Sequence, residues 1–143
     1  MPDGSVFGRV HVLVLCDEIE QRPGAEAVFD LRGVRTQVRA HAFPYRPPQF
    51  CVFLQVSGHE GTTSGQVVVV SEAGEEEIVS APIDDIQLRG PLAAIPVGLR
   101  IRNCEFPTPA VDWFQVILNQ KLVAERRFHV LETSESTNGQ PTP

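Results

Sequence analysis

Three cysteines and four histidines are the side chains of this sequence best suited to nucleophilic or metal chemistry. Cys51 is the strongest candidate nucleophile, because His41 and His59 lie near it in the sequence. A reactive thiolate needs a base within hydrogen-bonding reach and an exposed, electropositive setting. Cys51 instead lies inside the apolar run Phe50–Val56, a position typical of an inert core thiol. We therefore expect no catalytic cysteine at this position.

The other two cysteines, Cys16 and Cys104, are no better as nucleophiles. Cys16 precedes Asp17 and Glu18, whose negative charges raise the pKa of a thiol and reduce its reactivity. An odd number of cysteines, each in or beside an apolar run, indicates reduced and buried thiols. Because such thiols are typical of a reducing compartment, we predict a cytoplasmic protein without disulfides.

The polar residues do not have the spacing of a metal or cofactor site. The histidines form neither H-x-x-x-H nor H-E-x-x-H, and no C-x-x-C occurs. Asp84-Asp85 and Asp17–Glu20 are acidic clusters, but calcium needs roughly six to eight converging oxygens and no D-x-D-x-D array is present. The glycines of Gly58–Gly65 lack the Lys-Ser/Thr ending of a phosphate-binding loop. We expect no cofactor, no metal and no catalytic residues.

The segment Phe43–Phe50 (FPYRPPQF) is the strongest candidate for a binding site. Its three prolines stiffen the backbone, which lowers the entropy cost of presenting side chains to a partner. Tyr45 and Arg46 belong to residue types enriched at interface hot spots, so we name them as candidate binding residues with solvent-facing side chains. The alternative is an ordinary crossover between two strands, anchored in the core by Phe43 and Phe50.

The composition limits the classes of partner that the chain is expected to bind. A chain of 143 residues has the size of one domain, and its 42% hydrophobic content argues against disorder. The net charge of −6 disfavours nucleic acid, because that interaction rests on clustered Lys and Arg, and the only adjacent basic pair is Arg126-Arg127. The run Val10–Cys16 is far shorter than the roughly 20 apolar residues of a membrane span. We expect neither nucleic acid nor membrane as a partner.

Apolar residues recur at every second position more often than at helical spacing, which predicts β-strands. The predicted strands are Val10–Leu15, Val34–His41, Phe50–Ser57, Gln66–Ser71, Glu76–Ser80, Ala93–Asn103, Asp112–Leu118 and Lys121–Val130. Pro96 indicates that its strand begins at an edge or a bulge. Gly58–Gly65 is predicted as a hairpin loop, and Asp17–Glu26 and Asp84–Leu88 are the only candidates for short helices.

About seven to nine short strands separated by Gly and Pro turns favour an all-β fold, a two-sheet antiparallel β-sandwich. A small barrel is the main alternative. Residues 1–8 are expected to form a flexible N-terminus, 9–131 the β-sandwich domain, and 132–143 a disordered C-terminal tail.

Several short stretches together resemble a known family. They are Leu15–Ile19, Gly33-Val34, Ala42–Pro44 and Glu105–Pro109, in this order. The chain resembles an uncharacterised family of small bacterial proteins known only as a domain of unknown function, over roughly residues 10–130. The resemblance implies a bacterial β-sandwich that ends in an extended hairpin, and it implies no activity. The sequence departs from the family's pattern at Val111 and Gln120, where we expect glycine before the last hairpin and in its turn.

These observations predict a non-catalytic protein-binding or assembly module whose partner is another protein or a second copy of the chain. The alternative is an enzyme or small-ligand-binding protein with a site between the sheets or at one end of the sandwich. A concave pocket that holds a histidine and a carboxylate together would favour the alternative. A flat apolar patch beside Tyr45 would favour the binding module.

Overall fold

The computed structural model describes residues 8–24, 28–48, 50–72 and 76–133. Within these ranges the chain is all β and contains no helix. The strands are β1 (Arg9–Cys16), β2 (Glu18–Gln21), β3 (Phe29–Arg32), β4 (Gln37–Ala40), β5 (Cys51–Ser71), β6 (Glu77–Arg100), β7 (Ala110–Leu118) and β8 (Lys121–Glu132).

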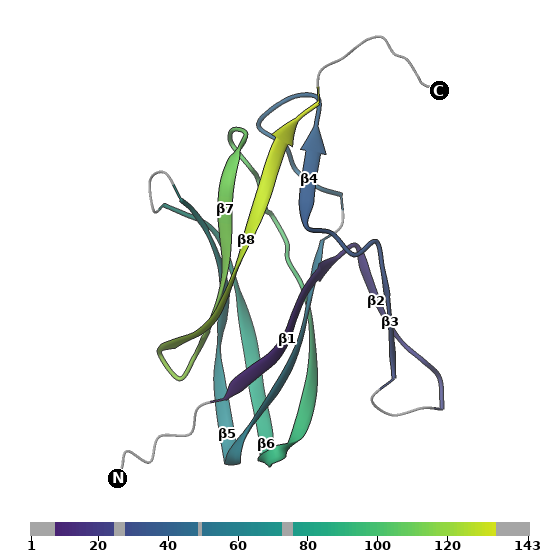
Figure 1. The fold of residues 1–143 in the computed structure, drawn as a ribbon, viewed down its shortest axis with the longest axis vertical. Helices are drawn as coiled ribbons and strands as arrows, with labels where there is room; N and C mark the ends of the chain where they lie inside the picture. The colour runs from purple at the N-terminus through teal and green to yellow at the C-terminus, as the bar shows by residue number, and fades with distance from the viewer. Residues whose placement is uncertain (1–7, 25–27, 49, 73–75, 134–143) are drawn as a thin grey trace.

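Six strands form one curled sheet in the order β1-β5-β7-β8-β4, with β6 on the other side of β5 (Figure 1). All pairs in it are antiparallel except β4 and β8, which run parallel. The sheet curls until β1 approaches β8, where Arg126 Nη1 donates to the Leu13 carbonyl at 3.1 Å. The all-β prediction is confirmed. The arrangement is a half-barrel plus a separate two-stranded sheet of β2 and β3, without a clear division into two large sheets.

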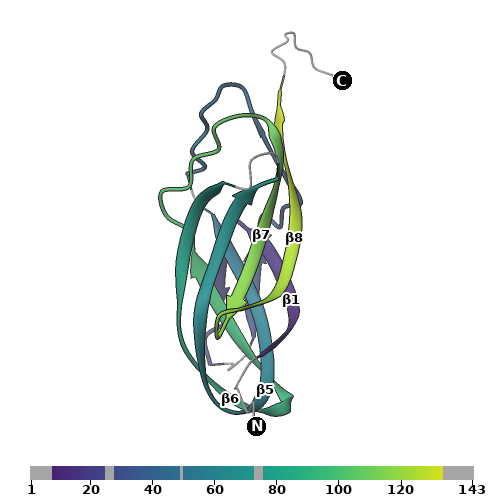
Figure 2. The ribbon, with the colours of Figure 1, turned by 90° about the vertical axis from the view of Figure 1, so that its left-hand side faces the viewer.

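The long hairpin of β5 and β6 was not expected, and the predicted loop at Gly58–Gly65 is wrong. These residues continue β5 and pair with β6, with register shifts beside Gly58, Gly61 and Gly65. Both long strands turn back at the lower end of the molecule (Figures 1 and 2). The glycines therefore mark bulges and a bend inside one strand, because glycine permits backbone conformations that other residues avoid.

The predicted helix at Asp84–Leu88 is also wrong, and the register explains why it looked helical. Ile83 pairs with Gly65 and Ile86 pairs with Thr63, so β6 carries one residue more than β5 between these pairs. This bulge places two exposed aspartates between two buried isoleucines and imitates helical spacing. The described part of Asp17–Glu26 contains strand β2 in place of the expected helix.

The edge position predicted from Pro96 is confirmed, because β6 pairs only with β5. The Ile101 amide donates to the Phe50 carbonyl at 2.8 Å, and the register from Arg100 to Ile95 has no shift. Alternation along an antiparallel pair then directs the backbone of Pro96 away from β5, toward the open edge. A proline there removes one amide donor from that edge and makes strand addition less favourable.

The C-terminal hairpin of β7 and β8 is confirmed. Its turn residues Asn119 and Gln120 have φ values of 51° and 66°, so the turn is made without glycine. The hairpin supplies Phe114 and Phe128 to the main core. Four fully buried phenylalanines pack there with ring centroids 5.2–6.4 Å apart: Phe50, Phe106, Phe114 and Phe128.

Two boundaries of the predicted domain fall near the ends of the described ranges. Glu132, assigned to the tail, pairs with Ala40, and the Thr133 amide donates to the Ala40 carbonyl at 2.8 Å. Residues 134–143 and 1–7 of the predicted tail and N-terminus lie outside the described residues.

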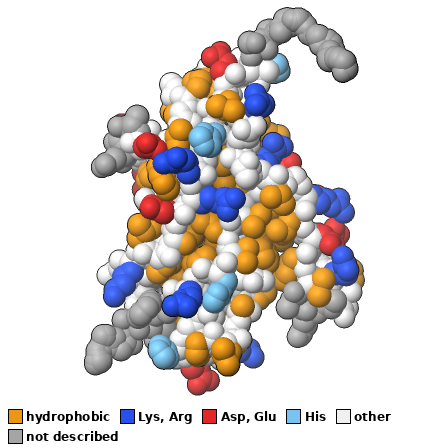
Figure 3. Space-filling model, in the orientation of Figure 1, with side chains coloured by type: hydrophobic (Ala, Val, Ile, Leu, Met, Phe, Trp, Pro, Cys, Tyr) orange, Lys and Arg blue, Asp and Glu red, His pale blue; other side chains and the backbone are white. Residues whose placement is uncertain are grey.

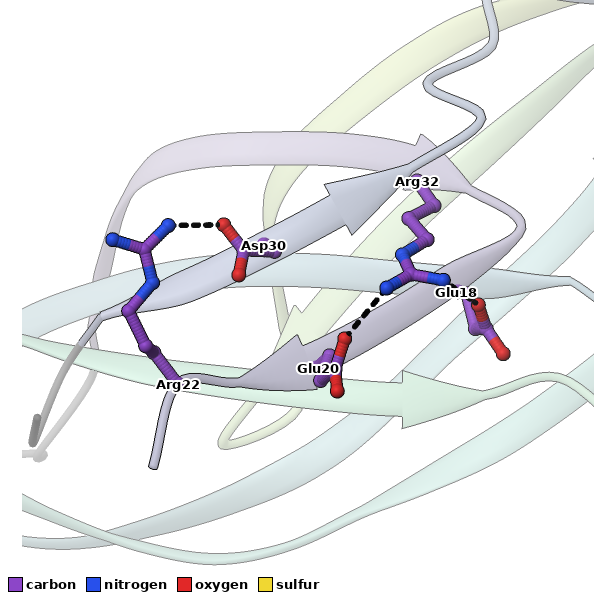
Figure 4. Close-up of polar contacts among 5 residues, drawn as sticks. All are labelled: Glu18, Glu20, Arg22, Asp30 and Arg32. Atoms are coloured by element: carbon purple, nitrogen blue, oxygen red, sulfur yellow. Dashed lines mark hydrogen bonds and ion pairs between the residues drawn. The ribbon is translucent and has the colours of Figure 1, made fainter. Parts of the chain in front are cut away.

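The small sheet of β2 and β3 covers the outer face of the main sheet. The rings of Phe29 and Phe53 have centroids 5.4 Å apart, and Ile19 lies beside Gly98. The opposite face of the small sheet carries ion pairs, which Figure 4 shows. Arg22 bonds Asp30 at 2.7 Å, and Arg32 bonds Glu20 at 3.0 Å. This face is exposed, so these pairs contribute little to stability.

Candidate functional site

Several residues of the predicted binding segment Phe43–Phe50 line a hollow of about 320 Å³ beside Tyr45. Its lining joins the end of β1, strand β4 and the segment Phe43–Phe50. The lining residues are Asp17, Glu18, Arg35, Val38, Arg39, Tyr45, Pro47, Pro48 and Phe50. We call this hollow the Tyr45 hollow. It is concave and mixed in polarity, so it is not the flat apolar patch that would have favoured a binding module.

Tyr45 and Arg46 are held by a neighbouring segment far along the chain. The backbone amide of Tyr45 donates to the Phe106 carbonyl, and the Phe106 amide donates back, each at 2.9 Å. Arg46 Nε bonds Glu105 Oε1 at 2.8 Å. These contacts fix the proline-rich segment against the Glu105–Pro109 turn that the sequence also singled out. The segment is therefore a supported ridge with a defined shape.

The exposure of the four residues predicted for this segment differs among them. The Arg46 side chain is 76% exposed, as expected. Tyr45 is half-buried and packs against the core, so its side chain is less solvent-facing than expected. Phe50 is buried as predicted, whereas Phe43 is only half-buried. Tyr45 faces the hollow, whereas Arg46 does not line it.

The opposite wall is built on the ion pair between Asp17 and Arg35. Arg35 Nε bonds Asp17 Oδ1 at 2.6 Å, and Arg35 Nη2 bonds Asp17 Oδ2 at 2.9 Å. This bidentate hydrogen bonding raises the pKa of Arg35. Gly33 makes room for the pair: its φ is +68°, and a Cβ there would lie 2.3 Å from Asp17 Oδ2. The close approach of the Asp17 side chain to the backbone at Gly33 thus explains the glycine noted in the sequence.

The Tyr45 hollow has an apolar floor and an exposed basic rim. Val38 and Phe50 form an apolar floor. Arg39 is exposed on the rim, and among the described residues it makes no salt bridge. An apolar floor beside a guanidinium is suited to a group that combines an apolar side chain with a carboxylate.

The thiols below this wall are unreactive in their present surroundings. Cys16 and Cys51 face each other across β1 and β5, and Cys51 Sγ donates to the Asp17 carbonyl at 3.5 Å. Burial raises the pKa of Cys16 to about 11 and also raises the pKa of Cys51. All three cysteines are free and buried, which confirms the predicted positions of the thiols in the core.

A second hollow, of about 270 Å³, lies at the bend of the long hairpin and was missed from the sequence. His11 Nε2 and Ser57 Oγ share a hydrogen bond of 2.6 Å across β1 and β5. Ser57 is only 2% exposed, and no carboxylate lines this hollow to orient the histidine. The pair therefore lacks the accessible serine and the third group of a hydrolase triad. No sequence spacing links residues 46 positions apart.

Asp112 is a further residue that the sequence did not single out. It is 1% exposed, and neither carboxylate oxygen has a hydrogen-bond partner among the described residues. Burial raises its pKa to about 6. Cys104 lies close enough to interact with the charge of Asp112, and burial raises the pKa of this thiol to about 12. Asp112 lines neither hollow, so its effect is on stability.

The described ranges contain neither a metal-binding cluster nor a membrane-spanning helix. No three His, Cys, Asp or Glu side chains there come together in a group able to hold a metal ion. The same ranges contain no helix with the length and hydropathy needed to span a membrane. Acidic side chains line the Tyr45 hollow, whereas histidines line the second hollow. Neither of these two hollows therefore brings a histidine and a carboxylate together.

Comparison with known proteins gives the family over most of the chain. Residues 11–131 match a family described as a family of unknown function, DUF6941. The chain belongs to DUF6941. The resemblance predicted from the short motifs is therefore confirmed. The matched residues contain the strands β2–β7, most of β1 and β8, the Tyr45 hollow, and the lining of the second hollow except Arg9. No curated protein matches the chain. Membership of DUF6941 carries no activity with it, so the function is argued from the site.

Proposed function

We propose that this DUF6941 protein is a non-catalytic protein-binding module and that the Tyr45 hollow is its recognition site. The observation that carries the proposal is the supported ridge of Tyr45, Pro47 and Pro48 beside an apolar floor. Backbone bonds to Phe106 hold the ridge in place before a partner arrives. A preformed site loses little conformational entropy on binding, which favours affinity.

The residues that line the hollow indicate which kind of partner would fit it. We propose an extended protein segment that places one apolar side chain on Val38 and Phe50 and one carboxylate against Arg39. Arg35 is already paired with Asp17, so Arg39 is the guanidinium left to meet a partner's acid. A proline-rich ridge and a tyrosine are also typical of surfaces that bind extended chains.

Assembly with a second copy through the open edge of β6 has less support. Pro96 removes a backbone donor from that edge, and exposed Asp84 and Asp85 lie along the same strand. Edge prolines and charges oppose strand addition. We therefore place recognition at the Tyr45 hollow. A bacterial source and a cytoplasmic location remain predictions, and the three buried free thiols support a reducing compartment.

Peptide display tests this proposal. The purified protein is used to select binders from a random peptide library, and selected peptides are measured against wild type and variants. We expect enriched peptides to combine an apolar residue with Asp or Glu. Tyr45→Ala and Arg39→Ala should each weaken binding at least tenfold, while Arg102→Ala, an exposed arginine outside the hollow, should leave it unchanged. Selected peptides that bind all four proteins equally would contradict the proposed site.

The alternative function, a small-ligand-binding protein with a site at one end, is favoured by a separate observation. The second hollow lies at the bend of β5 and β6, and its lining is rich in hydrogen-bond donors. This site is independent of the Tyr45 hollow, with which it shares no lining residue.

A further inference from the structure

The second hollow collects cationic and donor side chains from two strands. Arg9 and His11 come from β1, and Ser57 and His59 come from β5. Gly58 and Pro91 complete the lining. In Figure 3, histidine and Lys or Arg side chains are visible on the lower part of the face, where β1 begins and β5 bends, above an Asp or Glu side chain at the lower tip.

The fold fixes the positions of these groups. Arg9 and Ser57 are paired across β1 and β5, so the arginine lies beside the serine in the ladder. A register shift between Val10 and Val12 interrupts the ladder at His11, whose imidazole bonds Ser57 Oγ at 2.6 Å. The bend places His59 at the same hollow. Ser57 is buried at the base, whereas Arg9, His11 and His59 are exposed around it.

Among the described residues that line the hollow, none is acidic. Glu60 follows His59 in the chain but is not among the lining residues. Arg9 makes no salt bridge to any described residue. The hydrogen bond between His11 Nε2 and the buried Ser57 Oγ holds the imidazole in place at the hollow. The lining therefore offers a guanidinium and two imidazoles from two neighbouring strands.

We propose that this hollow binds a phosphate-type oxyanion carried by a small molecule or a lipid headgroup. A tetrahedral oxyanion has several oxygens that accept hydrogen bonds from different sides, which matches donors that come from two strands. A carboxylate is planar and carries a single charge, so it meets donors from fewer directions. The proposal does not rest on the protein-binding function of the Tyr45 hollow.

A titration with inorganic phosphate tests the site in the full chain. Histidine ring and Gly58 amide signals are followed by NMR as phosphate is added. We expect saturable shifts at His11, His59 and Gly58. Arg9→Gln and His59→Gln should each weaken binding at least fivefold, whereas Arg102→Gln and His41→Gln, exposed residues outside the hollow, should not change it. Amide spectra of all four variants establish that they are folded.

Acetate and vesicles distinguish the ligand class and its source. Acetate at the same ionic strength should bind at least fivefold more weakly than phosphate. Co-sedimentation with phosphatidylcholine vesicles containing phosphatidic acid, lost in Arg9→Gln, would assign the oxyanion to a lipid headgroup. Phosphate binding without co-sedimentation would assign it to a small molecule. Unsaturable shifts, equal binding of acetate, or equal binding by Arg9→Gln and Arg102→Gln would overturn the proposal.

Discussion

At the scale of single residues, Asp112 is a carboxylate whose pKa is raised by folding. Its pKa rises to about 6 because the carboxylate is buried. The folded-state pKa therefore lies above the roughly 3.9 of an unfolded aspartate. The folded protein binds this proton more tightly than the unfolded chain, so the contribution of Asp112 to stability is greatest below about pH 4 and falls as the pH rises toward 6. The loss is on the order of 3 kcal/mol.

We predict that Asp112→Asn removes this pH dependence. Relative to wild type, the variant should gain roughly 1–3 kcal/mol between pH 4 and pH 7.5, because it has no charge to bury. Urea denaturation at the two pH values measures the difference. Asp84→Asn, at an exposed aspartate, is the control and should show no such gain. An equal effect of Asp112→Asn at both pH values would show that Asp112 does not titrate in this range.

The thiols give a second prediction at this scale. Burial raises the pKa of Cys16 from 9.0 to about 11, which lowers its thiolate fraction about a hundredfold near neutral pH. We expect all three cysteines to react with a thiol reagent in denaturant, and to react at least a hundred times more slowly in the folded protein. The protein is prepared without reductant under conditions that prevent air oxidation. A count of one thiol in denaturant would contradict the reduced core.

Residue-scale features were the hardest to obtain from the sequence. Tyr45 and Arg46 were recognised by type and by their prolines, but the bonding of their segment to Glu105 and Phe106 comes from packing across the fold. Likewise, His11 and Ser57 meet only because β1 pairs with β5. Side-chain type is local information, whereas such proximity depends on strand register.

At the scale of elements, regular alternation predicted the final hairpin well, whereas only Gln37–Ala40 of the predicted strand Val34–His41 forms a strand. The final hairpin was recovered almost to its boundaries, because Asn119 sits between two alternating runs. The prediction of a loop at Gly58–Gly65 was wrong because glycine and polar residues occur both where a chain reverses and where a strand only bends. The parallel pairing of β4 with β8 also had no local signal, since the two strands are far apart in the sequence.

Gly65 tests the continuity of β5. A Cβ at this position would lie 1.8 Å from the Ile117 carbonyl oxygen of the neighbouring strand. We predict that Gly65→Ala destabilises the protein by about 2 kcal/mol or more, since overpacking against backbone forces the strands apart. Thermal or urea unfolding measures the change.

Gly98→Ala is the matched control for this prediction. A Cβ at Gly98 would meet only the flexible end of Ile19, at 3.3 Å, so its cost should stay below about 1 kcal/mol. A tolerated Gly65→Ala would instead support the hairpin loop that the sequence suggested.

At the scale of the whole molecule, one curled sheet places two dissimilar hollows at separate positions. The Tyr45 hollow joins three segments that are distant in the sequence, and the second hollow forms where the long hairpin bends. The all-β class followed from composition and alternation. The curl of the sheet did not, because closure depends on the bend of β5 and β6 and on the approach of β1 to β8.

Capture of the natural partner tests the central claim of protein binding at the Tyr45 hollow most directly. Tagged wild type, Tyr45→Ala and Arg102→Ala are used at equal concentration on lysate of the source cell, and captured proteins are quantified by mass spectrometry. Amide spectra first establish that each variant is folded. We predict that at least one protein captured by wild type and Arg102→Ala falls tenfold or more with Tyr45→Ala, since loss of a hot-spot side chain typically costs about 2 kcal/mol or more. Equal capture of every partner by the three folded proteins would contradict the account.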